Sequence, residues 1–147
     1  MMIRKISARH AASAMPLLEA QYRDHGIDMK GPRLLKAVRK LLDGHGLVFI
    51  ALDPQPIGIA VLAWEWSLER AGRQAWLEEL YVSPGRRGQG IGRKLLLHSF
   101  AAARKAGCVS IELEVIRGHD RSAHLYLREG FEKLPRSRYS RRLKPGA

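Results

Sequence analysis

The stretch RRGQGIGRKLLLHSFAAARKAG, residues 86–107, decides the fold prediction because a glycine turn in it leads directly into an apolar helix pattern. Backbone N–H groups at such a turn point outward, and the positive end of the helix dipole adds to them. Three glycines make the turn and four basic residues flank it: Gly88, Gly90 and Gly92, with Arg86, Arg87, Arg93 and Lys94. The stretch therefore predicts an anion site that suits phosphate or pyrophosphate.

Two common phosphate motifs do not fit this turn. A P-loop needs a lysine followed by Ser or Thr at the helix start, and here no hydroxyl residue follows Lys94. The dinucleotide fingerprint GxGxxG also fails, because the three glycines are spaced two residues apart and the preceding strand lies in mid-chain. The turn still joins a predicted strand to a predicted helix, which is where open α/β sheets usually bind ligands.

Size and composition predict one domain over residues 1–147, because 147 residues with 46% hydrophobic content can bury a core. The single cysteine, Cys108, excludes an intramolecular disulfide, and the histidines lack paired ligand spacing, so we expect no metal site. There is no apolar run of about 20 residues and no signal-peptide pattern at the start, so we expect a cytoplasmic protein without membrane association.

The net charge of +12 is unevenly distributed along the chain. Residues 83–106 and 131–147 form basic blocks, whereas residues 65–79 form an acidic interval. This distribution favours one anionic and one cationic ligand over nucleic acid, which we expect to bind weakly and only at low salt.

Apolar periodicity and turn residues predict a mixed α/β sheet with helices on both faces. A helix follows the glycine turn, and the others are expected at residues 8–24, from Pro32 to the glycines at 44 and 46, and at 121–129. The expected strands cover residues 3–7, 47–52, 57–66, 75–82 and 109–115, with a closing pair at 131–134 and 138–143.

The segment LYVSPGRRGQGIGRKLL, residues 80–96, resembles the acetyl-coenzyme A signature of the GNAT superfamily of N-acetyltransferases. In that signature an Arg or Gln, two residues, a Gly, one residue and a Gly or Ala lead into a helix. Arg87, Gly90 and Gly92 stand at these positions. HDRSAHLYLREGF, residues 119–131, looks like the family's second signature. The resemblance implies the GNAT-like acyl-CoA N-acyltransferase fold, a mixed sheet between helices.

The resemblance also implies how acetyl-coenzyme A binds. Its pyrophosphate would lie on the N–H groups of residues 87–92, and its pantetheine arm would run along residues 80–82 like another strand. The family usually has Asn where this chain has His119, whose imidazole differs in reach. The expected cofactor-binding residues are Leu80, Tyr81, Val82, Arg87, Gly88, Gln89, Gly90, Ile91, Gly92, Arg93, His119, Ser122 and Tyr126.

Acetyl transfer needs a neutral amine and a protonated thiol leaving group. Tyr126 matches the family's usual general acid. For the base, LEELYV resembles diamine-type acetyltransferases, which favours Glu78, buried between apolar neighbours. The LEV segment with Tyr126 resembles ribosomal-protein N-terminal acetyltransferases, which favours Glu114. Strand alternation places Glu79 on the other face as a surface acid, and a water relay without a dedicated base stays open.

The acidic interval favours a small polyamine or amino compound as acceptor, and Trp64 and Trp66 are candidates for an amine-binding wall through cation–π attraction. The same aromatics are candidates for the core or a homodimer contact. A protein N-terminus or lysine is the alternative acceptor. A module that only senses acyl-coenzyme A or binds nucleic acid is the alternative outside catalysis.

Overall fold

The computed structural model describes residues 1–145, which form two compact units. The larger unit is Met1–Glu114, and the smaller one begins at Val115. The expectation of a single domain stays a prediction.

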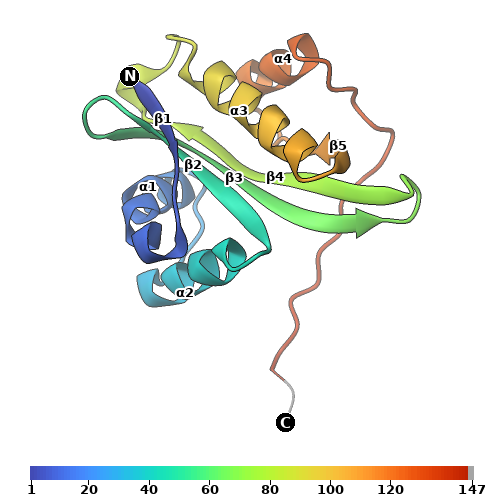
Figure 1. The fold of residues 1–147 in the computed structure, drawn as a ribbon, viewed down its shortest axis with the longest axis horizontal. Helices are drawn as coiled ribbons and strands as arrows, with labels where there is room; N and C mark the ends of the chain where they lie inside the picture. Colours follow the sequence, from blue (N-terminus) through green and yellow to red (C-terminus); the bar gives the residue numbers. More distant parts are fainter. Residues whose placement is uncertain (146–147) are drawn as a thin grey trace. The chain divides into compact units, whose positions relative to one another are not determined.

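The larger unit is built on a sheet whose strand order follows the chain, β1-β2-β3-β4-β5 (Figure 1). The strands are β1 (Met2–Lys5), β2 (Gly46–Leu52), β3 (Pro56–Ser67), β4 (Gly72–Val82) and β5 (Cys108–Glu112). Neighbours are antiparallel from β1 to β4, and β5 runs parallel to β4. The predicted mixed sheet is therefore confirmed, with β5 ending three residues earlier than expected.

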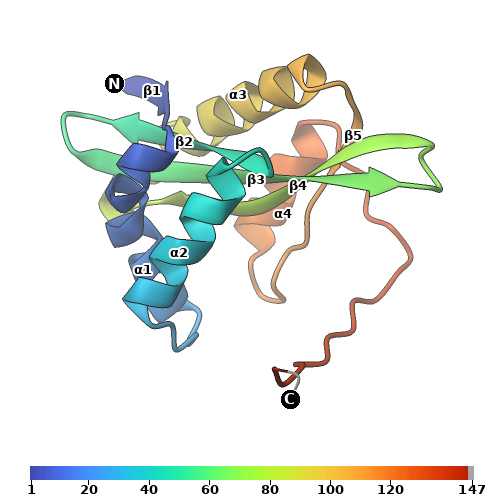
Figure 2. The same ribbon diagram turned by 60° about the horizontal axis from the view of Figure 1, so that its bottom comes forward.

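Helices cover both faces of this sheet, as predicted (Figure 2). The first face carries the 3₁₀ helix η1 (Ala8–Ala14), α1 (Met15–Asp24) and α2 (Gly31–Leu42), and the second carries α3 (Ile91–Lys105). Leu18 of α1 packs with Ile50 and Val61 of the sheet on the first face. On the second face, Leu95 approaches so closely that a Cβ on Gly58 would lie 3.1 Å from its Cδ1, so a side chain there would require Leu95 to shift.

The helix predicted at residues 8–24 is two helices of different type. Pro16 lies in the first turn of α1 and has no N–H to bond the carbonyl four residues earlier. The chain before it adopts the tighter 3₁₀ form, in which the Met15 N–H bonds to the Ala12 carbonyl.

A β-bulge in β4 changes which side chains share a face of this strand, so strict alternation does not hold along it. Val61 of β3 pairs with Glu79 of β4, but its neighbour Leu62 pairs with Leu77, so Glu78 is an extra residue. Cross-strand partners share a face, and Val61 belongs to the core beneath α1 and α2. Glu79 therefore faces α1, and Leu77 faces the opposite way with Leu62.

The smaller unit contains α4 (Asp120–Arg128). Gly130, at φ +93°, ends it, and the Phe131 N–H bonds back to the Tyr126 carbonyl at 3.0 Å. The predicted strands at 131–134 and 138–143 were wrong, since the described residues after α4 contain no strand. Pro135 removes a donor there, and the exposed basic side chains around it supply no apolar alternation.

Candidate active site

Two of the three glycines predicted to form the turn between β4 and α3 lie in it, whereas Gly92 lies in the first turn of α3. Gly88 and Gly90 have φ angles of +78° and +79°, in the left-handed region that favours glycine. Gly90 caps α3, and no atom lies within 4 Å of a Cβ built on it. The space beside Gly90 is therefore open, and the backbone conformation is what requires glycine.

The N-terminus of α3 is electropositive for two reasons. The first N–H groups of a helix lack intrahelical acceptors, and here the first bond of this helix joins the Lys94 N–H to the Gly90 carbonyl at 3.1 Å. The first turn of α3 carries no acidic residue. Donors from Gln89 to Arg93 are thus grouped at the positive end of the helix dipole.

Two arginine side chains tie this turn to neighbouring segments by an ion pair and a hydrogen bond. Arg86 forms an ion pair with Asp53 of the β2–β3 turn, and its hydrogen bond to Asp53 lowers the pKa of that carboxyl. The Nε of Arg87 donates to the Val82 carbonyl at 2.8 Å, and its guanidinium lies 5.4 Å from the ring centroid of Tyr81. Both side chains help to fix the path of the turn relative to β4.

The C-terminal half of β4 extends past its partner β5. The β4–β5 ladder runs from the Arg73–Cys108 pair to the Trp76–Glu112 pair, the last in the part of the chain that the structure describes. Residues 80–82 still pair with β3 on the other edge. The N–H and C=O groups that alternate toward the β5 side of this segment can therefore receive a strand-like ligand.

The bulge places two carboxylates side by side at the point where β5 leaves. Glu78 is exposed, whereas Glu79 is half-buried and accepts a hydrogen bond of 2.7 Å from the Tyr22 hydroxyl. Burial raises the pKa of Glu79, and the nearby charge of Glu78 raises it further. The expectations of a buried Glu78 and a surface Glu79 were both wrong, because the bulge turns Glu79 toward α1.

Sequence analysis missed the residues of α1 that meet this bulge. Neither Tyr22 nor Gln21 was among the candidate site residues. Gln21 is 6% exposed and lies near Glu79, where it lowers the pKa of that carboxyl against the larger effect of burial, and the Tyr81 hydroxyl donates to Asp24 at 3.3 Å. The available signal was a tyrosine on an apolar helix face, whose hydroxyl needs a partner when buried.

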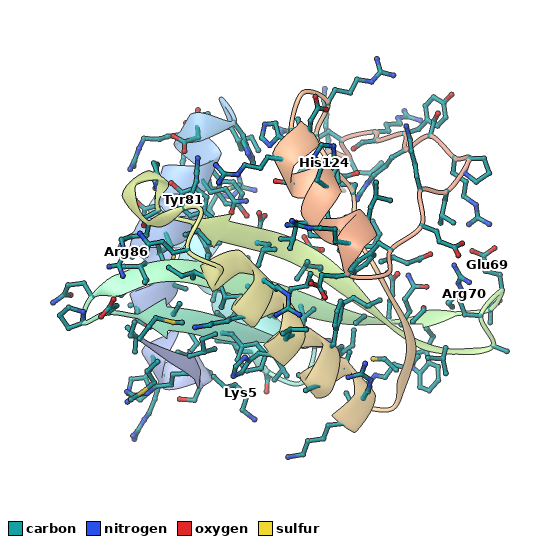
Figure 3. The ribbon with its side chains drawn as sticks, turned by 90° about the horizontal axis from the view of Figure 1, so that it is seen from above. Lys5, Glu69, Arg70, Tyr81, Arg86 and His124 are labelled. Carbon is teal, nitrogen blue, oxygen red and sulfur yellow. The ribbon has the colours of Figure 1, made fainter. Side chains whose placement is uncertain are left out.

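The tryptophans lie at the other end of the sheet from the glycine turn. Trp64 and Trp66 pair with Ala75 and Arg73, toward the β3–β4 hairpin. Figure 3 shows Glu69 and Arg70 of this hairpin at the opposite end from Tyr81 and Arg86. Arg73 lies over the Trp64 ring at 5.5 Å, and Trp66 is 77% exposed. A cation of the chain itself thus occupies one face of Trp64.

The remaining predicted residues lie after β5. Glu114 is exposed, two residues beyond the strand. In the smaller unit, His119 precedes α4, and Ser122 and Tyr126 are half-buried within it. The Tyr126 ring lies edge-on to Phe131, with centroids 5.6 Å apart. The roles of these four residues stay predictions.

Within residues 1–145, no cluster of three or more His, Cys, Asp or Glu side chains has the arrangement of a metal site. The helices in that same range are too short or too polar to cross a membrane.

Comparison with known proteins identifies the family. The model of the acetyltransferase (GNAT) family matches residues 12–131. The chain belongs to this family. The resemblance seen in the sequence is thereby confirmed, together with the GNAT-like fold.

Three relatives illustrate the range of the match. Streptothricin acetyltransferase of Streptomyces lavendulae is 32% identical over 90 residues, covering 60% of this chain and 45% of that protein. Thialysine N-epsilon-acetyltransferase of Bos taurus is 33% identical over 81 residues, with 55% and 47% covered. This chain thus spans about half of these curated relatives. A predicted acetyltransferase from Clostridium acetobutylicum, solved with acetyl-CoA, has a TM-score of 0.81 at 19% identity over 95% of both chains.

Proposed function

We propose that this protein transfers the acetyl group of acetyl-coenzyme A directly to a primary amine. The observation that carries the proposal is that three features follow one another along β4 and into the start of α3. The β4 bulge carries two carboxylates, the next residues of β4 offer an edge beyond β5, and the glycine turn groups N–H donors at the start of α3. Membership of the GNAT family supports it.

Each feature has a part in holding the co-substrate. The N–H groups of residues 88–93 bind the pyrophosphate, since the turn and the helix dipole both favour an anion. The outer edge of residues 80–82 hydrogen-bonds the amides of the pantetheine arm as a neighbouring strand would. Arg86 and Arg87 keep the turn in place through Asp53 and the Val82 carbonyl.

The reaction is a direct acyl transfer without a covalent enzyme intermediate. The neutral amine nitrogen attacks the thioester carbonyl carbon, and the C–S bond breaks when the tetrahedral intermediate collapses. Glu78 takes the first proton from the ammonium form of the amine. Tyr126 supplies the proton that the departing thiolate needs, and the proton that the nitrogen releases as the amide forms restores the Tyr126 phenol. The place of Glu78 on the bulge, just before the part of β4 that extends past β5, supports Glu78 as the base. Glu114 remains the alternative.

A small cationic amine is the favoured acceptor. The names of the streptothricin and thialysine acetyltransferases describe enzymes that acetylate small amino compounds. The carboxylates of β4 support the same choice, because they attract a cationic group before it loses its proton. A peptide N-terminus or lysine carries the same ammonium chemistry and is the second acceptor class.

The test is release of free thiol from acetyl-coenzyme A in the presence of diamines, monoamines and peptides with free N-termini. We expect the fastest release with diamines. Thiol release with peptides alone would indicate that the acceptor is a protein and not a small amine. No release above the rate without amine, in a sample that binds coenzyme A, would identify a non-catalytic acyl-coenzyme A module instead.

Tyr126→Phe tests the acid. We expect turnover to fall roughly ten- to a thousand-fold with cofactor affinity unchanged, because the ring stays and only the proton donor is lost. Full activity would leave Tyr126 with its packing against Phe131.

A further inference from the structure

The exposed side of α2 carries a cluster of cations that the charge distribution along the sequence did not single out. Leu34 and Val38 of this helix are buried in the core. The basic residues between positions 30 and 40 are all exposed, and no acidic residue lies among them: Lys30, Arg33, Lys36, Arg39 and Lys40. Helical spacing therefore gathers the positive charge on the solvent side of α2.

Two hollows of the surface have η1 as a shared wall and are lined by basic side chains. The first, of about 410 Å³, lies between the start of η1 at Ala8 and α2. The second, of about 220 Å³, lies between η1 and β1. The basic lining residues are Lys36, Arg39 and Lys40 in the first hollow and Arg4, Lys5 and His10 in the second. The two hollows therefore form one positively charged region.

The Lys and Arg side chains of this region have no carboxylate partner within residues 1–145. Arg86 forms an ion pair with Asp53, but no ion pair includes a Lys or Arg that lines either hollow. Asp43 lines the first hollow and is exposed, without an ion pair to them. Lys36 and Lys40 stand four positions apart on α2, where like charges repel and destabilise a helix. An anionic partner would remove this repulsion.

The character of the surface favours phosphates over an acidic protein. Protein–protein interfaces have an apolar core rich in aromatic side chains, whereas α2 and η1 expose no large hydrophobic side chain. Interfaces with nucleic acid are polar and strongly positive instead. No Phe, Tyr or Trp lines either hollow, so the region offers no stacking platform for unpaired bases. Contacts to the phosphates of a duplex fit these observations best.

We propose that Arg4, Lys5, Lys36, Arg39 and Lys40, called here the basic surface, bind the phosphate backbone of a nucleic-acid duplex whatever its sequence. Arg39 can hold one phosphate through two N–H groups, and the lysines act as point charges. α2 lies on the face of the sheet opposite α3 (Figure 2), so these cations are distinct from those of the glycine turn. The weak binding expected from the composition is thereby assigned to a defined surface, independently of the acetyl transfer.

Fluorescence anisotropy with labelled DNA and RNA duplexes of about 20 base pairs tests this binding. We expect micromolar affinity at about 50 mM salt and a loss of about 100-fold at about 200 mM, because roughly four phosphate contacts release their counterions. Duplexes of unrelated sequence should bind within about three-fold of one another. Absence of binding at the lower salt concentration, or strong preference for one sequence, would overturn the proposal.

The decisive variant combines Arg39→Gln with Lys40→Gln, and its matched control combines Arg104→Gln with Lys105→Gln. Each removes an Arg–Lys pair from the last turn of a helix, so both change the net charge and the helix end alike. We expect the α2 variant to bind the duplexes about ten-fold more weakly, with a salt slope smaller by about two. The α3 control should stay within about three-fold of the parent chain. Equal losses in both would attribute binding to net charge alone and overturn the basic surface.

Two further measurements separate this proposal from altered folding and from a protein partner. Coenzyme A affinity by calorimetry should be the same in the α2 variant and the parent chain, which also shows that the variant is folded. Poly-L-glutamate should displace the labelled duplex only at a charge concentration at least about ten-fold above that of unlabelled duplex. Equal or better displacement would identify an acidic protein segment as the partner and overturn the proposal.

Discussion

The two halves of β4 differ in what surrounds them and in what they do with polar side chains. From Gly72 to Leu77 the strand lies between β3 and β5, and its buried Gln74 donates to Glu65 at 2.6 Å and accepts from Ser110 at 3.3 Å. From Glu79 to Val82 it pairs with β3 alone and meets α1, where the oxygen of Gln21 lacks a donor.

One extra residue thus separates a structural half of β4 from the half that we propose binds acetyl-coenzyme A and the amine, called here the ligand-binding half. In the first half the polar groups satisfy one another across the strands, which stabilises the sheet and leaves little for a ligand. Beyond the bulge at Glu78, the strand presents one outer edge, two carboxylates and the glycine turn. Bulges commonly re-aim side chains beside active sites in this way.

The largest effect is expected at the end of the ligand-binding half. Gly90→Asp should reduce coenzyme A affinity on the order of 100-fold or more, because a carboxylate enters the pyrophosphate site. The fold should persist, since Asp tolerates a positive φ better than most residues. Isothermal titration calorimetry measures the affinity.

Gly107→Asp is the matched control. It adds the same residue at φ +80° next to the other end of α3, so it carries similar backbone strain. Its affinity for coenzyme A should stay near that of the parent chain. Equal losses in both variants would attribute the effect to strain rather than to the anion site.

The next effect concerns the bulge itself. Glu78→Gln should lower activity near neutral pH by about 100-fold and remove the acidic limb of the pH–rate profile, because the amide cannot accept a proton. Glu114→Gln should change the rate by less than about three-fold. The reverse order, with peptides as acceptors, would support the N-terminal acetyltransferase mechanism. Unchanged pH–rate profiles in both variants would indicate that water takes the proton from the amine.

A smaller effect is expected in the structural half. Gln74→Leu should lower the free energy of unfolding by about 1–2 kcal/mol, since Glu65 and Ser110 lose their shared partner. Urea denaturation measures this loss. Coenzyme A affinity and the KM for the amine should not change, and a raised KM would extend the ligand-binding half across the bulge.

The smallest effect is the pH dependence of stability. Burial and the charge of Glu78 raise the pKa of Glu79 above 4.5, so the folded chain binds this proton more tightly than the unfolded chain. Its contribution to the free energy of unfolding is therefore present below the unfolded pKa and is lost as the pH rises through the folded value. Glu79→Gln should flatten that decline in urea titrations at several pH values.

Asp53, which pairs with Arg86 at the glycine turn, gives the free energy of unfolding a pH dependence of opposite sign. Its hydrogen bond with Arg86 lowers the pKa of the carboxyl below 3.8, so its contribution is present above that value and is lost as the pH falls through the folded pKa. Asp53→Asn should remove only the loss of unfolding free energy at acidic pH. The decrease with rising pH that is due to Glu79 should remain. A decline that disappears in both variants would contradict the assignment to Glu79.

The sequence by itself determined the elements whose signals are local. The glycine turn, the start of α2 at Pro32, the end of α4 at Gly130 and the sheet strands follow from backbone preferences and apolar periodicity over a few residues. The proposed anion site at α3 depends on equally local signals, because the turn and the helix that would form it are adjacent in the chain.

Only the tertiary structure decided the bulge and the contacts made around it. A bulge is a shift of register between β3 and β4. Strict alternation within β4 would place Leu77 and Glu79 on one face, but the bulge puts them on opposite faces. The Tyr22–Glu79 hydrogen bond joins residues 57 positions apart, and no periodicity within one segment encodes such a pair. The carboxylate that sequence analysis placed on the surface is half-buried, because burial depends on the helix packed against the strand as well as on the strand itself.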